Sequence, residues 1–200
     1  MTVILASNSP RRMELLQQLG WTFEVEVPGV DEDLLPGTLP DAGVRELACR
    51  KALAAASRHR DAMVIAADTA VALDGLWLGK PRDEEDARAM LKMLSARTHQ
   101  VFSGVCVVKG ETAVCRSECT LVEFGEISDW EIDKYVSSGE PMDKAGAYGI
   151  QGRAAVFVKG IEGCFYNVMG LPLRLLCTLV DEVMAQDGLT AMELMDWQRH

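Results

Sequence analysis

The sequence predicts a mixed α/β fold in which the chain crosses between two lobes. Two observations support this: short apolar runs typical of strands alternate with helical patterns along the 200 residues, and two long strand patterns follow one another at 99–109 and 112–124. A chain of this length can bury one sizeable core. We therefore expect a single domain over 1–186 and a weakly amphipathic, fraying C-terminal tail over 187–200.

The first half of the chain alternates strands with helices. Ser9 as N-cap and Pro10 in the first turn mark the start of one helix, and Asp74-Gly75 is typical of a hairpin turn. The expected strands are 3–6, 22–27, 63–73 and 76–78, and the expected helices are 10–19, 41–57 and 83–94.

In the second half, Lys109-Gly110 predicts a turn between the two long strands. Ser128 and Glu131 form a capping-box pattern at the start of the next helix. The glycine-rich stretch 143–152 is too short for a helix. The remaining elements expected are a helix over 128–137, strands over 154–159 and 164–169 around a Gly160–Gly163 turn, and a helix over 172–186.

Composition excludes several classes of protein. A formal net charge of -10 argues against a general nucleic-acid binder, which is normally basic. The chain has neither a signal-peptide pattern nor an apolar run long enough to span a membrane, so we expect no membrane partner and a cytoplasmic location. The six cysteines form no C-x-x-C pair and mostly lie in apolar runs. This pattern predicts reduced, buried thiols and disfavours zinc.

The stretch Leu5-Ala-Ser-Asn-Ser-Pro-Arg-Arg12 carries the strongest functional signal. It places the hydroxyls of Ser7 and Ser9 and the guanidinium groups of Arg11 and Arg12 at a predicted helix N-terminus. Free N–H groups, the positive end of the helix dipole and fixed cations together attract phosphate. The stretch is not a Walker A loop. An ordinary capped helix with two solvated arginines remains the alternative.

Isolated charged residues stand at the ends of other elements. Asp68 directly follows an apolar run, where a buried carboxylate needs a partner or a metal. The alternative is a strand end at which Asp68 faces water or caps a turn. Lys80 lies in a short Gly-Lys-Pro loop, Lys51 on a helix and Glu32 in an acidic loop; each could instead be an ordinary solvated residue. Taken alone, these residues predict a phosphate-ester hydrolase or a nucleotide binder.

Six ordered motifs make the chain resemble the Maf family of nucleoside triphosphate pyrophosphatases over residues 2–186. They are Leu5–Arg12, Leu47–Ala52, Ala66–Thr69, Gly79–Arg82, Asp143–Gln151 and Val168–Leu173. The resemblance implies a long central β-sheet flanked by helices, with a cleft between two lobes, as in inosine triphosphate pyrophosphatases. It also implies a homodimer and a link to septum formation and cell-division arrest.

By the same resemblance, Asp68 matches the catalytic carboxylate and Lys80 belongs to the catalytic set. Ser7, Arg12 and Lys51 match phosphate-binding positions. Glu32 and Asp68 would hold a divalent metal cation, Mg²⁺ or Mn²⁺. The reaction implied is attack by water on the α-phosphorus of a nucleoside triphosphate, which releases a monophosphate and pyrophosphate.

Three further positions indicate the substrate. Arg11, Thr69 and Gln151 match the subgroup that acts on dTTP and UTP, whereas a sister group carries Trp, Gln and Glu and prefers 7-methyl-GTP. The resemblance thus implies removal of pyrimidine triphosphates, modified ones included, from the nucleotide pool. Ser103 departs from the family pattern and is expected not to touch the catalytic set. A nucleotide-binding regulator of septum formation with incidental hydrolysis is the alternative.

Overall fold

The structure, a computed structural model, describes residues 1–196, and within this range seven strands form one mixed sheet. The strand order is β2-β1-β3-β5-β6-β7, with β4 paired to β3. Strand β1 is parallel to β2 and β3, and the other pairs are antiparallel. The strands are β1 (Val3–Leu5), β2 (Glu24–Val25), β3 (Met63–Leu73), β4 (Leu76–Leu78), β5 (Thr98–Lys109), β6 (Thr112–Phe124) and β7 (Val158–Glu162).

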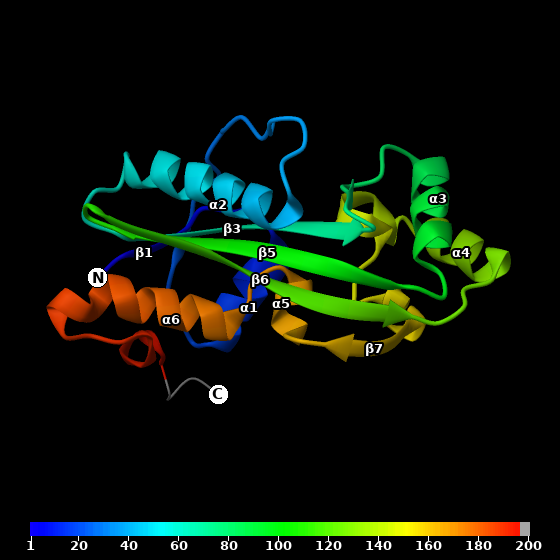
Figure 1. The fold of residues 1–200 in the computed structure, drawn as a ribbon. Helices are drawn as coiled ribbons and strands as arrows, with labels where there is room; N and C mark the ends of the chain where they lie inside the picture. The colour runs from blue at the N-terminus through cyan, green and yellow to red at the C-terminus, as the bar shows by residue number, and fades with distance from the viewer. Residues whose placement is uncertain (197–200) are drawn as a thin grey trace.

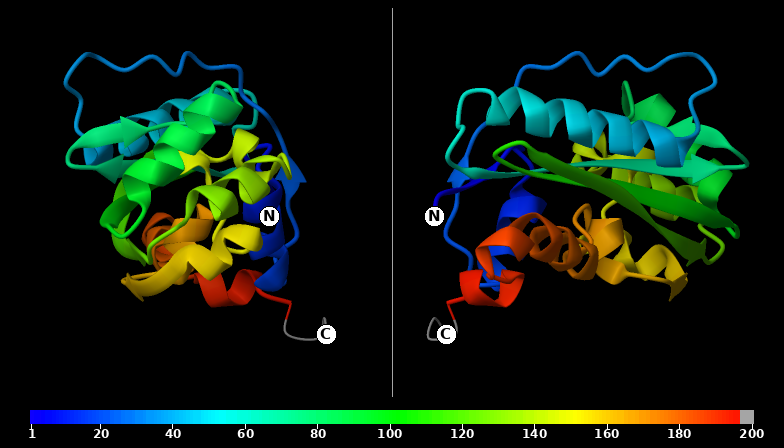
Figure 2. Two further views of the ribbon diagram at one scale, coloured as in Figure 1. Left: turned by 90° about the vertical axis from the view of Figure 1, so that its right-hand side faces the viewer. Right: turned by 60° about the vertical axis from the view of Figure 1, so that its left-hand side comes forward.

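Helices cover both faces of this sheet (Figures 1 and 2). Helix α2 lies on one face, α1 and α6 lie on the other, and α3 and α4 stand together at one end. The helices are α1 (Pro10–Gln18), α2 (Pro40–Ala56), α3 (Glu84–Leu94), α4 (Asp129–Val136), α5 (Phe165–Met169) and α6 (Leu173–Met184). The predicted mixed α/β fold with a long central sheet is confirmed.

The sheet divides the core into two apolar clusters. The larger one packs Leu15 and Leu16 of α1 and the buried face of α6 against the sheet. The smaller one, under α2, consists largely of alanines, including Ala48, Ala52 and Ala55. Such small side chains let the helix backbone come close to the strands. Gly104 of β5 contributes to this approach, because a Cβ atom there would lie 2.3 Å from the carbonyl oxygen of Val44.

Several local expectations are confirmed. Asp74 and Gly75 both have positive φ, as a two-residue hairpin turn requires. Ser128 and Glu131 form the expected capping box on α4. Ser9 is the N-cap residue of α1, but its hydroxyl makes no capping hydrogen bond. Its backbone N–H instead donates to Ser7 Oγ, 3.2 Å away.

The expected strand pair at 154–159 and 164–169 is wrong. Residues Arg153–Phe157 form a 3₁₀ helix, β7 runs through the expected turn at Gly160, and Phe165–Met169 is the helix α5. The helix forms because Gly170 ends it in a left-handed conformation and because the side chain of Asn167 is buried among hydrogen-bond partners from β5 and β6. These partners are distant in sequence, so the local apolar pattern alone favoured a strand.

The C-terminal region continues beyond the domain boundary expected at residue 186. Two 3₁₀ turns, Ala185–Asp187 and Ala191–Leu194, follow α6. Ala191 is buried, and its N–H donates to the Asp181 carboxylate at 2.7 Å. Residues 197–200, the end of the expected fraying tail, lie outside the described residues. No helix within residues 1–196 is long and apolar enough to cross a membrane.

The cysteines differ from the expectation of six reduced thiols. Cys106 of β5 and Cys115 of β6 stand directly opposite one another in the strand register and form a disulfide. The four other cysteines are free. Cross-strand register brings the two residues together, and this register depends on how β5 and β6 turn at Gly110.

His99 predicts a stability change at acidic pH. Its ring is buried, Nε2 lies 2.8 Å from Tyr148 Oη, and Nδ1 has no partner among the described residues. Burial lowers the pKa of His99 from 6.5 to about 4. Between these two values the unfolded chain binds a proton that the native protein does not, so stability falls as the pH falls through this range.

The loss from this group is expected to reach about 3 kcal/mol below the native pKa. Urea unfolding of the wild type and of His99→Gln at pH 7 and pH 4.5 checks it, because Gln can still meet Tyr148 but does not titrate. Both proteins contain the same carboxylates, whose titration also changes stability at acidic pH, so the difference between the two losses reports on His99. The variant should therefore lose less stability between the two pH values, and equal losses would remove His99 from the explanation.

Candidate active site

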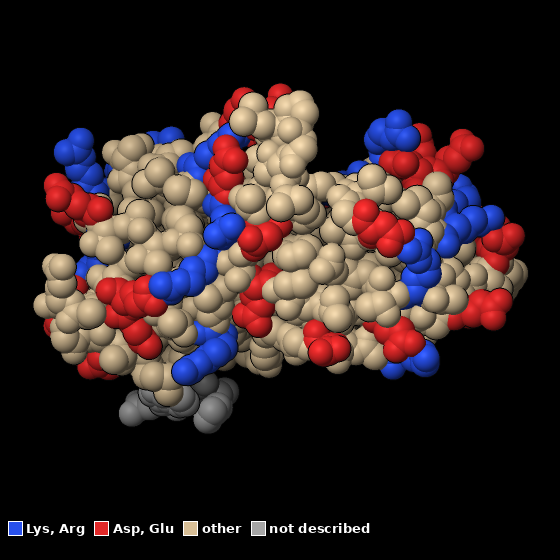
Figure 3. Space-filling view, viewed as in Figure 1, with Lys and Arg blue, Asp and Glu red and all other residues tan. Residues whose placement is uncertain are grey.

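One cavity of about 700 Å³ collects most of the residues expected to act. It is lined by the β1–α1 segment, the acidic loop, α2, the middle of β3 and the loop after β4. Residues 143–148, around the 3₁₀ turns Glu140–Asp143 and Ala145–Ala147, and the end of α5 complete the lining. Ser7, Arg11, Arg12, Glu32, Lys51, Asp68, Thr69 and Lys80 all belong to its lining, and Gln151 does not. Figure 3 shows basic and acidic side chains interspersed over the face drawn there, without a large basic patch.

Arg12 is fixed by three hydrogen bonds at the floor of this cavity. Its guanidinium donates to Ser7 Oγ at 3.0 Å, to Thr69 Oγ1 at 3.1 Å and to the Gly170 carbonyl at 2.9 Å. Burial lowers the pKa of Arg12, and the negative charge of Asp68 opposes this shift. Arginine stays protonated in proteins even so. The site therefore holds a permanent, oriented cation beside the N-terminus of α1.

Gly170 makes this arrangement possible. Its φ of +107° is in the region that favours glycine, and a Cβ atom there would lie 3.3 Å from Thr69 Oγ1. The glycine thus turns its carbonyl toward Arg12 without crowding Thr69.

A second cluster joins two carboxylates through one lysine. Lys51 Nζ lies 2.6 Å from Asp68 Oδ1 and 2.7 Å from Glu32 Oε1. The side chains of Lys51 and Asp68 are only 13% and 17% exposed, whereas that of Glu32 is 63% exposed. The pairing offsets the cost of removing the two inner charges from water. Asp68 Oδ2 accepts no hydrogen bond from residues 1–196 and remains available to a ligand.

The acidic loop that carries Glu32 is tied to α2. Arg50, the neighbour of Lys51, donates to the carbonyls of Asp31 and Asp33 at 3.0 and 2.9 Å. Sequence reasoning missed this arginine, although it lies within the Leu47–Ala52 motif. These two contacts hold the loop so that Glu32 reaches Lys51. One turn of α2 thus fixes the acidic loop through Arg50 and the Asp68 carboxylate through Lys51.

Lys80 supplies a further cation to the cavity from the loop after β4. It follows β4 in a loop that is held by a hydrogen bond from Gly146 N–H to the Gly79 carbonyl at 3.0 Å. The side chain lines the cavity and is exposed. Within the part of the chain that the structure describes, Lys80 makes no ion pair. Its charge is therefore free to meet an anionic ligand.

The three positions expected to select the substrate are not equivalent. Arg11 lines the cavity, Thr69 is held inside it, and Gln151 is exposed and lies outside the lining. Thr69 Oγ1 lies 2.8 Å from Ser103 Oγ and accepts from Arg12. This contact gives Thr69 a positioning role toward Arg12.

Ser103 contacts the site more closely than its sequence suggested. It pairs with Thr69 in the β3–β5 register, and its hydroxyl also donates to the Asn167 carbonyl at 2.9 Å. It touches Thr69 rather than Asp68 or Lys80. Residues paired across antiparallel strands point to the same face of a sheet. Pairing the two expected strands 63–73 and 99–109 could therefore have placed Ser103 beside Thr69.

Aromatic residues that the sequence did not single out complete the cavity. Trp77 and Tyr148 are both part of its lining. Trp77 Nε1 donates to the Thr38 carbonyl at 3.1 Å, and Tyr148 is held by His99. Such rings offer flat apolar faces to a planar ligand.

The arrangement favours a particular ligand. Three fixed or free cations, two hydroxyls and a helix N-terminus suit a polyphosphate, and paired carboxylates suit a hard divalent cation. A carboxylate oxygen without a protein partner can accept a proton from water.

Comparison with known proteins finds a matching family and several similar proteins. The family described as Maf-like protein matches residues 2–183. A dTTP/UTP pyrophosphatase of Symbiobacterium thermophilum is 52% identical over 172 residues, covering 86% of this chain and 89% of that protein. Proteins of the same name from Pelotomaculum thermopropionicum and Aquifex aeolicus are 49% and 48% identical, and cover 89% and 92% of this chain and 94% and 96% of their own.

A solved structure is similar in fold. The Staphylococcus aureus Ham1 protein superposes with a TM-score of 0.50 at 16% identity, over 94% of this chain and 100% of that one. At this identity the likeness concerns the fold alone.

Proposed function

The chain belongs to the Maf family, and from this premise we propose that it hydrolyses dTTP and UTP to the nucleoside monophosphate and pyrophosphate. The observation that carries the proposal is the meeting of Arg12, Lys51, Lys80 and Asp68 in one cavity. Relatives about half identical over most of the chain bear the name of this activity. Hydrolysis needs a base and charge compensation, and Asp68 and these cations are proposed to supply them.

Asp68 is proposed as the general base. Its Oδ1 is held by Lys51 at 2.6 Å, which orients the carboxylate and leaves Oδ2 to accept a proton from the attacking water. Strand β3 is buried along most of its length, so the carboxylate sits on a rigid support. The water would then attack the α-phosphorus, with pyrophosphate as the leaving group.

The cations are proposed to compensate the charge that grows on the phosphates. Arg12 and Ser7 lie at the N-terminus of α1, Lys51 lies beside Asp68, and Lys80 lines the same cavity. Preorganised donors of this kind stabilise the transition state more than the ground state. Lys80, which has no ion partner within residues 1–196, is suited to the leaving pyrophosphate.

Glu32 and Asp68 are proposed to hold Mg²⁺ or Mn²⁺. The fit rests on proximity: Lys51 Nζ lies within 2.7 Å of one oxygen from each carboxylate, so the two carboxylates are neighbours, and the ion would use their second oxygens. Hard cations of this type bind through one or two carboxylates together with substrate phosphates. Such a cation, when bound, would neutralise charge on the phosphates.

The preference for pyrimidines gives a further prediction. Values of kcat/KM for dTTP and UTP are expected to exceed those for CTP and purine triphosphates about 10- to 100-fold, because the wrong base leaves buried polar groups unpaired. Arg11 and Thr69 line the cavity whereas Gln151 is exposed outside it, so Arg11→Trp and Thr69→Gln together should change the preference more than Gln151→Glu does alone. The change of all three residues to Trp, Gln and Glu should favour 7-methyl-GTP. Gln186→Glu, an exposed residue of the C-terminal region, is the matched control.

A panel of triphosphates assayed for pyrophosphate release, with and without Mg²⁺ or Mn²⁺, tests the function directly. Release from dTTP is expected only with the metal. A nucleotide-binding regulator of septum formation would instead bind dTTP with little turnover. A wild type that treats all bases alike would remove the subgroup assignment and leave the pyrophosphatase activity standing.

Other expectations from the sequence stay predictions. Action on modified pyrimidine triphosphates is tested by adding them to the same panel. A homodimer is tested by sedimentation of the purified chain, and a cytoplasmic location by fractionation of cells that express it.

A further inference from the structure

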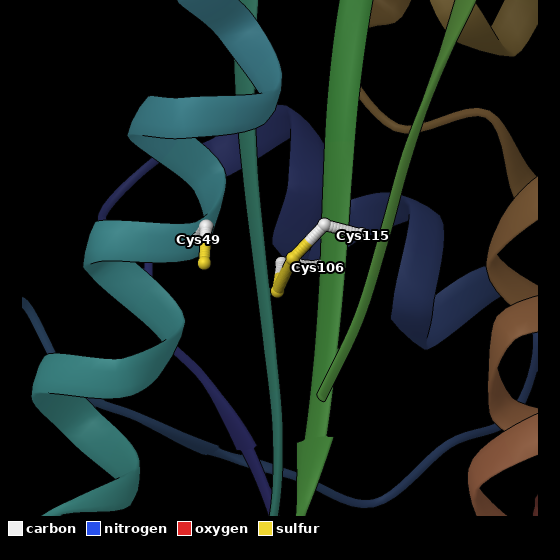
Figure 4. Close-up of side chains that lie close together, drawn as sticks. All are labelled: Cys49, Cys106 and Cys115. Carbon is white, nitrogen blue, oxygen red and sulfur yellow. A yellow bond between two sulfur atoms is a disulfide. The ribbon is translucent and has the colours of Figure 1, made fainter. Parts of the chain in front are cut away.

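Three cysteines far apart in sequence meet between α2 and the sheet. Cys49 comes from α2, Cys106 from β5 and Cys115 from β6, and their sulfur atoms all lie within 4.8 Å of one another. Figure 4 shows Cys49 on its helix beside the bonded pair on the two strands. Their spacing in the sequence gave no sign of this cluster.

The close packing of α2 explains why the three sulfurs converge. Cys49 lies among the alanines of the smaller apolar cluster, which also contains Cys106 and Cys115. Gly104, two residues before Cys106, lets the helix backbone approach β5. The helix and both strands belong to the body of the fold, so the cluster is held in place by packing that does not depend on the disulfide alone.

We propose that reduction of the Cys106–Cys115 disulfide turns this cluster into a binding site for one thiophilic d¹⁰ cation such as Zn²⁺. Zinc binds thiolates at about 2.3 Å in tetrahedral geometry, which places the sulfurs about 3.8 Å apart. The three sulfur atoms already lie within 4.8 Å, so small movements suffice. Cys106 is buried while Cys49 and Cys115 are partly exposed, which leaves a side open for water as fourth ligand.

The chemistry balances with a dithiol as the reductant. The reductant gives two electrons and two protons to the disulfide, forming two thiols while it becomes a disulfide itself. The cation then displaces the thiol protons to solvent. Of the three cluster cysteines, only Cys49 keeps a thiol in the oxidised protein, so three-sulfur ligation is confined to the reduced protein.

This site is chemically distinct from the cavity of Asp68. Thiolates select soft and borderline cations, whereas Mg²⁺ and Mn²⁺ prefer carboxylate and phosphate oxygens. Mg²⁺ in an assay of the proposed hydrolysis should therefore not compete for the cysteines. The proposal does not rest on the hydrolytic function, and either can fail without the other.

The test uses the full chain, reduced with a dithiol that is then removed without oxygen, and Cd²⁺ as a spectroscopic probe. Titration is expected to produce thiolate-to-cadmium charge-transfer absorption that saturates at one Cd²⁺ per chain, and Zn²⁺ should displace it. The oxidised protein should show no such saturable band. Zn²⁺ should also raise the Tm of the reduced protein, because it binds the folded state.

Variants assign the ligands. Cys49→Ser, on a helix and partly exposed, should fold and bind Cd²⁺ at least about tenfold more weakly, since even outer-shell changes cost that much. Cys119→Ser, an exposed cysteine of β6 outside the cluster, is the matched control and should bind normally. The proposal is overturned if reduced wild type gives no stoichiometric band, if Cys49→Ser binds like wild type, or if Cys119→Ser loses binding.

Discussion

Replacing Asp68 by Asn is expected to lower kcat for dTTP about 10²- to 10⁴-fold, the usual cost of losing a general base. The amide oxygen of Asn can still accept the hydrogen bond from Lys51, which lies 2.6 Å from Oδ1. Local geometry is thus preserved while the proton acceptor is lost. Pyrophosphate release measures turnover. Direct binding of dTTP to the inactive variant measures its affinity for the substrate.

Asp133→Asn is the matched control for this substitution. Asp133 is an exposed carboxylate of α4 that pairs with Arg88, outside the cavity. It should leave kcat unchanged. Asp133→Asn should unfold near the wild-type urea midpoint, and Asp68→Asn, in which Lys51 keeps Glu32 as its ion partner, should still unfold cooperatively. A near-normal kcat in Asp68→Asn would exclude Asp68 as the base, even if the protein remains a pyrophosphatase.

Arg12→Ala is expected to lower kcat/KM for dTTP about 10²- to 10³-fold, as for loss of one preorganised donor to a developing charge. The loss should be aggravated because Ser7 Oγ, Thr69 Oγ1 and the Gly170 carbonyl each lose a donor. Arg12→Lys should recover little of the lost kcat/KM, since one ammonium group cannot replace a planar guanidinium that donates to three acceptors in a fixed geometry. Steady-state kinetics on both variants check this.

Arg116→Ala is the control for charge removal. Arg116 forms a two-pronged ion pair with Glu182 on the surface, away from the cavity. Its loss should leave kcat/KM unchanged. If Arg12→Ala cleaves dTTP normally, the opening motif is an ordinary capped helix, the alternative that its sequence left open.

Local chemistry in the sequence was enough for much of the fold. The run from Met63 to Leu73, the turn at Asp74-Gly75 and the capping box at Ser128 each depend on neighbouring residues, and each is found where expected. The motif residues likewise lie together, except Gln151. A strand's period, a turn's need for positive φ and a helix's free N–H groups are local properties, so they can be inferred from a few adjacent residues.

Tertiary structure alone decided the contacts between distant segments. Arg12 meets Gly170, Lys51 meets Asp68, and Cys49 meets Cys106 only because strand register and the close approach of α2 bring them together. The helix at 165–169 likewise depends on partners for Asn167 from β5 and β6. Each of these contacts joins residues that are far apart in the sequence. A local sequence pattern does not specify which distant residues become neighbours in the folded sheet.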